Sequence, residues 1–373
     1  MSKDDTNGPS ENSVRDQARR QFLKLAGATG VAVGSASAFG TTNVLGQLTE
    51  GEGGAMQVEI EDLEGQLPID DRYLRIATVA SAKAAQLQQN YFGRIGEAEE
   101  KDPQNLLTEV DTIAEELIIE TIQEELGDDF EDEEHAIFGE ETGGDLEGDF
   151  EYLWIVDPLD GTTNFVKGIP HFGVNIAVAT LDDGELDELH AAVTYYSLRD
   201  EVWVAVQDEG AYKFDSDGYD LVAEDSEPTE MSVTETETID NSFNGVGFYL
   251  KETMDDFDYI GLWRYLVAYS QGTRLLGAAA PDIAFVADGV FDTVSVKDLK
   301  AVDVASGVLL VREAGGEVTD FDESEDLTDL LEGDLVATNA ELQDDFFELL
   351  DDSGKSWLTD PIDELAPEDS TGQ

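Results

Sequence analysis

Apolar positions along the chain recur with two different spacings, which predict where helices and strands lie. In residues 70–91 and 108–126 the apolar side chains recur every three or four positions, as in amphipathic helices. The continuous apolar run at 152–156 (YLWIV) predicts a strand that is buried on both faces. Further strand-like runs, separated by turn residues such as DDG and DEG, predict an antiparallel meander. These runs are 172–180, 190–196, 201–206 and 211–214.

The remaining segments divide into acidic loops and a second region of alternating elements. Residues 127–151 are acidic and contain glycine, which predicts a loop with one short apolar piece at 135–138. Residues 215–240 predict exposed loop and an edge strand. Helix and strand patterns alternate again from Gly245 onward. We expect helices near 253–269, 281–287, 304–314 and 341–350, and a strand at 335–338.

The first 38 residues have the pattern of an export signal. Arg19 and Arg20 precede FLK and a weakly apolar run at 25–39, which contains the small residues ASA at 36–38. This run is shorter than the ~20 residues that span a bilayer. It resembles a twin-arginine signal with a small-residue cleavage site, the alternative being an Ala-rich helix behind a chance basic cluster. We expect an exported protein, with no membrane span beyond an uncleaved signal, and a cytoplasmic one if this interpretation fails.

Composition divides the rest of the chain into a linker, a folded region and a tail. Residues 39–68 are rich in Gly and Glu and predict a flexible linker. The folded region is expected at 69–351, as two subdomains at 69–240 and 241–351, followed by an acidic tail at 352–373. At 373 residues with 41% hydrophobic content, the chain has enough apolar material for one large core or two fused ones.

Charge and residue usage exclude several classes of function. The 86 acidic and 20 basic residues give a net charge of -66, a balance that resembles proteins of extreme halophiles and is tolerable where salt screens repulsion. So negative a surface is a poor partner for nucleic acid or an anionic membrane. The chain has no cysteine and only three histidines. A metal site must therefore use oxygen ligands, which favours Mg²⁺, Ca²⁺ or Mn²⁺.

The segment 157–163 (DPLDGTT) concentrates the candidate chemistry. It follows the buried strand at 152–156, so two carboxylates are placed at one strand end. Pro158 stiffens the turn, Gly161 allows close backbone approach, and the Gly-Thr-Thr sequence can open a helix whose N–H groups face an anion. An Asp-Gly turn with a threonine N-cap is the structural alternative. The combination predicts a site for metal-assisted phosphoryl transfer.

Four ordered segments resemble the inositol monophosphatase family of the lithium-sensitive, fructose-bisphosphatase-like superfamily, and the acidic composition suggests a halophilic archaeal type. They are TEVD at 108–111, FGEET at 138–142, WIVDPLDGTTNF at 154–165 and VDVASG at 302–307. The resemblance covers roughly residues 70–350 and implies a layered α-β-α-β-α fold, a mixed α/β class. It also implies a homodimer and two or three Mg²⁺ ions.

The resemblance assigns roles to individual residues. Thr162, hydrogen-bonded to Asp111, would orient the attacking water together with Glu140. The metal ligands would be Glu140, Asp157, the Leu159 carbonyl, Asp160 and Asp303. Phosphate and substrate would meet Asp160, Gly161, Thr162, Gly277, Ala279, Lys297 and Lys300. In isolation, Asp303 could be an N-cap, Glu140 a solvated loop charge and Asp111 an exposed helix residue.

The substrate side departs from the family pattern. Inositol phosphatases carry an acidic residue seven positions before the third metal aspartate, where this chain has Val296. Lys297 and Lys300 stand nearby and could meet a second phosphate, or could balance local acidic charge. We therefore expect inositol 1-phosphate, fructose 1,6-bisphosphate or both as substrate. The alternatives are a nucleotide phosphatase of the 3′-phosphoadenosine or NADP type, and an exported metal- or polyol-binding protein with a retired site.

Overall fold

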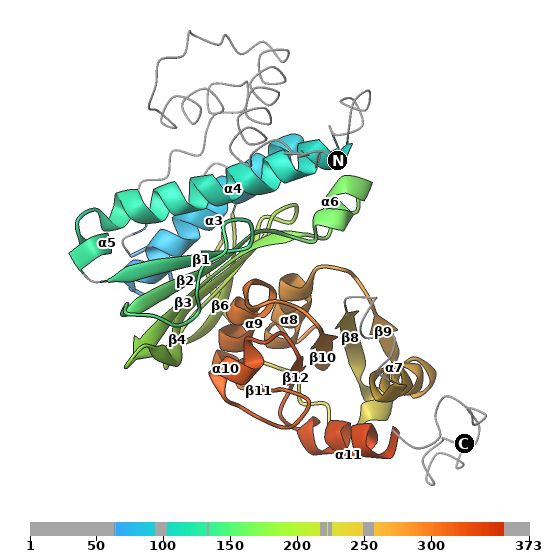
Figure 1. The fold of residues 1–373 in the computed structure, drawn as a ribbon. Coiled ribbons are helices and arrows are strands. Elements are labelled where there is room, and N and C mark those ends of the chain that lie inside the picture. Colours follow the sequence, from blue (N-terminus) through green and yellow to red (C-terminus); the bar gives the residue numbers. More distant parts are fainter. Residues whose placement is uncertain are drawn as a thin grey trace, which may run out of the picture.

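Two β-sheets alternate with three helical layers in the part of the chain that the structure describes (Figure 1). The structure is a computed structural model, and the residues it describes are 63, 65–93, 103–132, 134–216, 222, 226–248 and 257–353. The predicted signal, most of the predicted linker and most of the predicted tail lie outside these residues. None of the helices among the described residues is long and apolar enough to cross a membrane.

Two long helices form the first layer. α3 (Arg72–Tyr91) begins after Asp71, whose side chain accepts a hydrogen bond from the Leu74 N–H at 2.8 Å and caps the helix. α4 (Pro103–Leu126) begins five residues before the predicted start. Its first residue is proline, which suits the first helical turn because that position needs no N–H donor. The short α5 (Asp129–Asp132) follows.

A seven-stranded sheet lies under these helices, with its strands in chain order. β1 pairs with β2 in parallel, and every other neighbouring pair is antiparallel, so the predicted meander is confirmed. The predicted strand at 152–156 is longer than expected, because β2 continues through the metal motif to Asp160. The strands are β1 (His135–Gly139), β2 (Tyr152–Asp160), β3 (Gly173–Asp182), β4 (Glu185–Tyr196), β5 (Glu201–Val206), β6 (Gly210–Asp215) and β7 (Thr229–Glu230).

The second half of the chain supplies the remaining three layers (Figure 1). α8 and α9 lie between the two sheets, and α7 and α11 cover the outer face of a five-stranded sheet of order β11-β12-β10-β8-β9. The helices are α6 (Thr162–Lys167), α7 (Phe257–Tyr269), α8 (Ala279–Ala287), α9 (Ala301–Glu313), α10 (Leu327–Leu330), α11 (Gln343–Ser353) and the 3₁₀ turn η3 (Ile239–Asn241). The strands are β8 (Phe243–Phe248), β9 (Gly272–Arg274), β10 (Thr293–Lys297), β11 (Glu317–Thr319) and β12 (Leu335–Thr338).

Three buried apolar clusters hold the layers together. One joins α3 and α4 to the first sheet, the second joins the two sheets through α8 and α9, and the third joins the second sheet to α7 and α11. Each sheet is therefore covered on both faces, which explains the nearly continuous apolar runs of strands such as β2. The predicted α-β-α-β-α sandwich is confirmed.

Two expectations from the sequence need correction. The predicted flexible linker ends earlier than residue 68, because Leu63 and Leu67 are buried in the cluster around α3. The strands β8 to β11 were not predicted individually, since they are short and β8 contains two glycines. Gly245 is required there: a Cβ at this position would lie 2.8 Å from Val294 Cγ2 on the adjacent β10.

Candidate active site

The turn at the end of β2 places two aspartates close together. The pairing of β2 with β3 shifts between Asp157 and Asp160, so the strand is irregular at this point. Asp157 Oδ1 accepts a hydrogen bond from the Leu159 N–H at 2.9 Å, which fixes the turn from inside. The carbonyl of Pro158 accepts a hydrogen bond from Gln88 Nε2 at 2.6 Å, so α3 holds the turn from the outside.

The residues that follow pack this turn against α8. Gly161 has φ of 88°, and a Cβ there would lie 2.9 Å from Ala278 Cβ and 3.0 Å from the His171 carbonyl. Only glycine allows both the conformation and the close approach. Asn164, on α6, donates hydrogen bonds to the carbonyls of His171 at 2.9 Å and Leu276 at 2.8 Å. The motif is thereby tied to the segment before α8.

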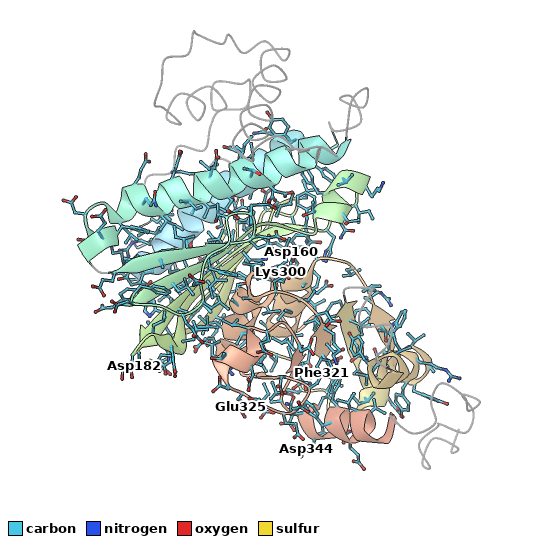
Figure 2. The ribbon with its side chains drawn as sticks, viewed as in Figure 1. Asp160, Asp182, Lys300, Phe321, Glu325 and Asp344 are labelled. Carbon is cyan, nitrogen blue, oxygen red and sulfur yellow. The ribbon has the colours of Figure 1, made fainter. Side chains whose placement is uncertain are left out.

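Asp303 reaches the same place from α9. It is the third residue of that helix, and its Oδ2 accepts a hydrogen bond from the Lys300 N–H at 2.7 Å. Asp303 thus caps the helix and also faces the metal motif, so the two interpretations of this residue are compatible. Figure 2 shows Asp160 and Lys300 close to one another between the first sheet and the α8–α9 layer.

Three carboxylates converge to form a candidate metal centre. One oxygen each from Asp157, Asp160 and Asp303 lies within 4.8 Å of the other two. Asp157 and Asp160 are 1% and 8% exposed. In the described part of the chain, Asp157 Oδ2 has no hydrogen-bond partner. A buried, unpaired carboxylate oxygen is costly unless a cation compensates it, so the site fits a hard divalent ion.

The pKa values of these carboxyl groups express the same shortage of positive charge. Burial, together with repulsion from Glu140, Asp160 and Asp303, raises the pKa of Asp157 well above its usual range. Burial and the charge of Asp303 do the same to the pKa of Asp160, against hydrogen bonds from the Ala280 and Ala279 N–H groups. Burial raises the pKa of Asp303 to about 6. A bound cation would lower all three.

Glu140 lies next to this centre on a loop that the buried Glu115 holds. β1 and β2 are parallel with Gly139 opposite Val156, and the Glu140 N–H donates to the Val156 carbonyl at 3.1 Å. Glu140 therefore stands beside Asp157 at the end of two adjacent strands. Glu115, which is fully buried on α4, accepts hydrogen bonds from the N–H groups of Glu141 and Thr142, both at 2.8 Å.

The role of Glu115 was missed in the sequence. Its one signal is its spacing, since it follows Asp111 by four positions and so lies on the same face of α4. In a chain with 86 acidic residues this spacing alone does not single it out. The side chain of Asp111 is itself 6% exposed, so it is not the exposed helix residue that the alternative interpretation required.

The expected hydrogen bond from Thr162 to Asp111 is not formed. Thr162 Oγ1 donates instead to the Leu159 carbonyl at 3.0 Å, because the turn brings that carbonyl within reach. Asp111 Oδ1 has no hydrogen-bond partner among the described residues. Burial, with the charges of Glu141, Glu140 and Glu115, raises the pKa of Asp111 to about 8. Asp111 thus belongs to the acidic cluster, without a direct bond to Thr162.

Comparisons with known proteins agree with this geometry. Residues 70–355 match the Inositol monophosphatase family. The protein named Nus factor SuhB is 36% identical over 273 residues in Pseudomonas aeruginosa and 36% over 269 in Escherichia coli, covering 71% of this chain and 91% of each relative. The inositol monophosphatase of Anabaena superposes with a TM-score of 0.59 at 27% identity, over 75% of this chain and 96% of that structure.

The chain belongs to the inositol monophosphatase family. Family membership places the protein among the phosphatases of this superfamily, which are generally metal-dependent. Of the four carboxylates that the sequence predicts as metal ligands, Asp157 and Asp160 lie on β2, Asp303 lies on α9, and Glu140 directly follows β1.

Two candidate substrate residues of this family member lie apart from each other. Lys300 Nζ is 2.8 Å from Glu140 Oε1, so its ammonium is at the carboxylate cluster. Lys297 Nζ lies 3.7 Å from Asp334 Oδ2 and 4.8 Å from the centre of the Phe321 ring. Figure 2 places Phe321 well away from Asp160 and Lys300. These contacts favour the charge-balancing alternative for Lys297, and its assignment as a substrate residue stays a prediction.

The other substrate-side residues are placed by α8 and β10. Gly277, with φ of 84°, contacts the Asn164 side chain, and Ala279 begins α8 and directs its N–H to Asp160. Both lie at the motif, where Gly277 accepts a hydrogen bond from Asn164, and their role in binding substrate stays a prediction. Val296 is 1% exposed in the core between the sheets. No polar contact to a polyol is available from its side chain.

Proposed function

We propose that this protein is a Mg²⁺-dependent phosphate monoester hydrolase that acts on a small sugar or polyol phosphate. The observation that carries the proposal is the convergence of Asp157, Asp160 and Asp303, with one buried Asp157 oxygen that has no hydrogen-bond partner in the described structure. Membership of the inositol monophosphatase family supports the same reaction. Oxygen-only ligands favour Mg²⁺ over softer metals.

The chain's own residues supply binding and proton transfer. Two or three Mg²⁺ ions, held by the three aspartates, Glu140 and the Leu159 carbonyl, would neutralise the phosphate and activate water. The N–H groups of Gly161 and Thr162 are our candidates for binding phosphate oxygens. Asp111, which is buried beside this cluster, is our candidate for accepting a proton from the water; its pKa of about 8 in the metal-free protein would fall when cations neutralise the neighbouring carboxylates. Thr162 and Glu140 orient the attacking water.

The proposed substrates are inositol 1-phosphate and fructose 1,6-bisphosphate. The buried Val296 removes the acidic contact expected for strict inositol specificity, which supports a broader substrate range. Of the two candidate lysines, Lys300 is the one whose ammonium lies at the carboxylate cluster, since Lys297 contacts Asp334. A lysine beside the centre suits an ester that carries more than one phosphate.

The experiment is phosphate release from a panel of sugar, polyol and nucleotide phosphates in multimolar KCl, with Mg²⁺ or EDTA. We expect turnover of sugar or polyol phosphates with Mg²⁺ and none with EDTA. Full activity in EDTA, or no turnover of any ester by folded protein, would contradict the proposal. Preference for a nucleotide would move the assignment to the alternative class of substrate.

We also propose that the protein is exported by a twin-arginine pathway, acts at high salt and forms a homodimer. The basis for export is the pattern at Arg19 and Arg20, and the basis for a salt requirement is the net charge of -66. Changing both arginines to lysine should leave the protein inside the cell. Gel filtration with light scattering in multimolar KCl should give twice the chain's mass, and loss of structure on dilution into low salt would support the salt requirement.

A further inference from the structure

The Lys300 ammonium contacts a carboxylate that the proposed function needs for metal. Lys300 Nζ and Glu140 Oε1 are 2.8 Å apart and join residues 160 positions apart in the chain, at the start of α9 and the end of β1. The backbone N–H of Lys300 also donates to Asp303 Oδ2. One residue therefore touches two of the carboxylates at the centre, one through its charge and one through its backbone.

Glu140 differs from the three aspartates in its surroundings. It is not among the carboxylates whose oxygens converge within 4.8 Å, although its charge raises the pKa of Asp157 and Asp303. Its side chain is 21% exposed, compared with 1% for Asp157. Glu140 is thus the outer carboxylate of the cluster, and in this structure one of its oxygens is neutralised by an ammonium.

An ammonium and a divalent cation compete for a carboxylate, because each neutralises the same charge and occupies the same oxygen. The Lys300 side chain is 52% exposed and carries its charge on a flexible four-carbon stem, so it can leave Glu140 at small cost. We propose that Lys300 is an internal competitor for the divalent ion at Glu140, and that metal loading displaces its ammonium towards the incoming phosphate ester.

This inference rests on the proposed function and deepens it. In the metal-free protein, Lys300 offsets part of the repulsion among these carboxylates. When Glu140 binds a metal ion, the same ammonium is released to interact with an anionic ester, to which it contributes a point charge. The Lys300 ammonium forms its ion pair with Glu140, so it competes mainly for the ion there, and we expect the ion at the three aspartates to bind more tightly.

The test is titration of the full protein with Mn²⁺ alone, by calorimetry in multimolar KCl, comparing the wild type with Lys300→Met. Lys213→Met is the matched control, because Lys213 forms a similar pair, 2.7 Å from the Asp288 carboxylate. Asp157→Asn, which lacks one of the three converging carboxylates, measures how much Mn²⁺ binds elsewhere on the acidic surface. We expect Lys300→Met to bind the weaker Mn²⁺ roughly two- to fivefold more tightly, with the stronger ion unchanged. Lys213→Met should match the wild type.

Two further measurements separate this effect from a structural one. In a Glu140→Gln background, Lys300→Met should no longer change Mn²⁺ affinity, because the competition has been removed. The KM for inositol 1-phosphate should rise roughly two- to fivefold in Lys300→Met. A general structural defect would weaken the binding of both the Mn²⁺ ion and the phosphate ester. Loss of the competing ammonium should instead strengthen Mn²⁺ binding and weaken ester binding.

Failure of the Lys300 competition and failure of the proposed metal-dependent function give different results. If Lys300→Met binds the weaker Mn²⁺ no more tightly than the wild type, the proposed competition is wrong. If the wild type still binds more Mn²⁺ than Asp157→Asn does, the proposed metal site stands in that case. An unchanged KM overturns the role of the displaced ammonium. Equal Mn²⁺ binding by wild type and Asp157→Asn overturns the proposed function and this inference with it.

Discussion

Asp157 and Asp282 are both almost completely buried, but the partner of Asp282 is a histidine whereas the neighbours of Asp157 are other carboxylates. Asp282, on α8, lies 2.9 Å from His171 Nε2, and His171 Nδ1 lies 2.7 Å from the Tyr196 hydroxyl. Asp157 lies among carboxylates and has one oxygen without a hydrogen-bond partner in the described structure. Burial raises the pKa of both, but at Asp282 the histidine opposes this shift.

The difference separates a carboxylate that stabilises the fold from one that requires an added cation. Asp282 has its partners within the protein, including the Leu276 N–H, and links α8 to the segment that contacts Asn164. Among the described residues, the carboxylates of the candidate metal centre have backbone N–H groups and the outer Lys300 as partners. The stability of the metal-free protein is therefore reduced where its proposed activity is located.

The largest expected effect is on activity, from Asp157→Asn. The amide keeps the size of the side chain but loses the charge that holds the cation, so phosphate release should fall roughly 10³-fold or more. The same change removes a buried, unpaired charge, so the metal-free variant should melt at a higher temperature than the wild type. Asp187→Asn, at an exposed position on β4, is the control and should change neither quantity.

Asp282→Ala should act on stability in the opposite direction. Removing the carboxylate leaves the buried His171 and the Leu276 N–H without their partner, which should cost about 2–4 kcal/mol of unfolding free energy. Denaturant unfolding in multimolar KCl measures the loss, which should be the same with Mg²⁺ and with EDTA. Asp282→Asn retains part of the hydrogen bonding and should lose less. A stability equal to the wild type would show that the His171 pair does not support the fold.

The pH dependence of metal stabilisation should follow the raised pKa values of the site. In the metal-free folded protein Asp303 holds its proton up to a pKa of about 6, above the ~3.9 of an unfolded aspartate, so its contribution to stability declines as pH rises through that window. Mg²⁺ needs the ionised form and competes with the proton. The melting-temperature difference between Mg²⁺ and EDTA should therefore widen from pH 5 to 8.

The control for this pH effect is Asp303→Asn, measured in the same high-salt buffer. It removes one of the three converging carboxylates, so the difference in melting temperature should be smaller and should widen less with pH. A difference that is constant across this range in the wild type would contradict the assignment of these carboxylates to the metal.

The smallest effect is expected from Lys297→Met, which sharpens the contrast with Lys300. Lys297 contacts Asp334 and Phe321, so its loss should cost about 0.5–1 kcal/mol of stability. The KM for fructose 1,6-bisphosphate should stay within twofold of the wild type, as measured by phosphate release. An increase in this KM larger than that of Lys300→Met would support Lys297 as a substrate residue.

The sequence predicted those elements whose signal is local. Regular apolar spacing located α3 and α4, continuous apolar runs located β2 and its antiparallel partners, and the DPLDGTT turn located the centre. The partners Glu140 and Asp303 were predicted because each stands in its own recognisable segment. Their distances and burial depend on how the layers pack, which the sequence pattern does not contain.

Features that depend on tertiary contacts were missed or misassigned. Lys297 and Lys300 are three residues apart and looked equivalent in sequence, but one turns to Phe321 and the other to Glu140. Glu115 was indistinguishable from the other acids until its two backbone donors were known. The predicted hydrogen bond from Thr162 to Asp111 was wrong because the turn brings the Leu159 carbonyl within 3.0 Å of the Thr162 hydroxyl. Short strands such as β9, with three residues, have too few positions to show a period.

The most direct test of the metal centre is a crystal structure of the protein grown in multimolar salt with Mn²⁺, using the anomalous signal of manganese to locate the ions. We predict a strong peak bonded to oxygens of Asp157, Asp160 and Asp303 together. Asp157→Asn crystals should lack this peak. Well-ordered crystals with manganese at other positions and none between these three carboxylates would contradict the account.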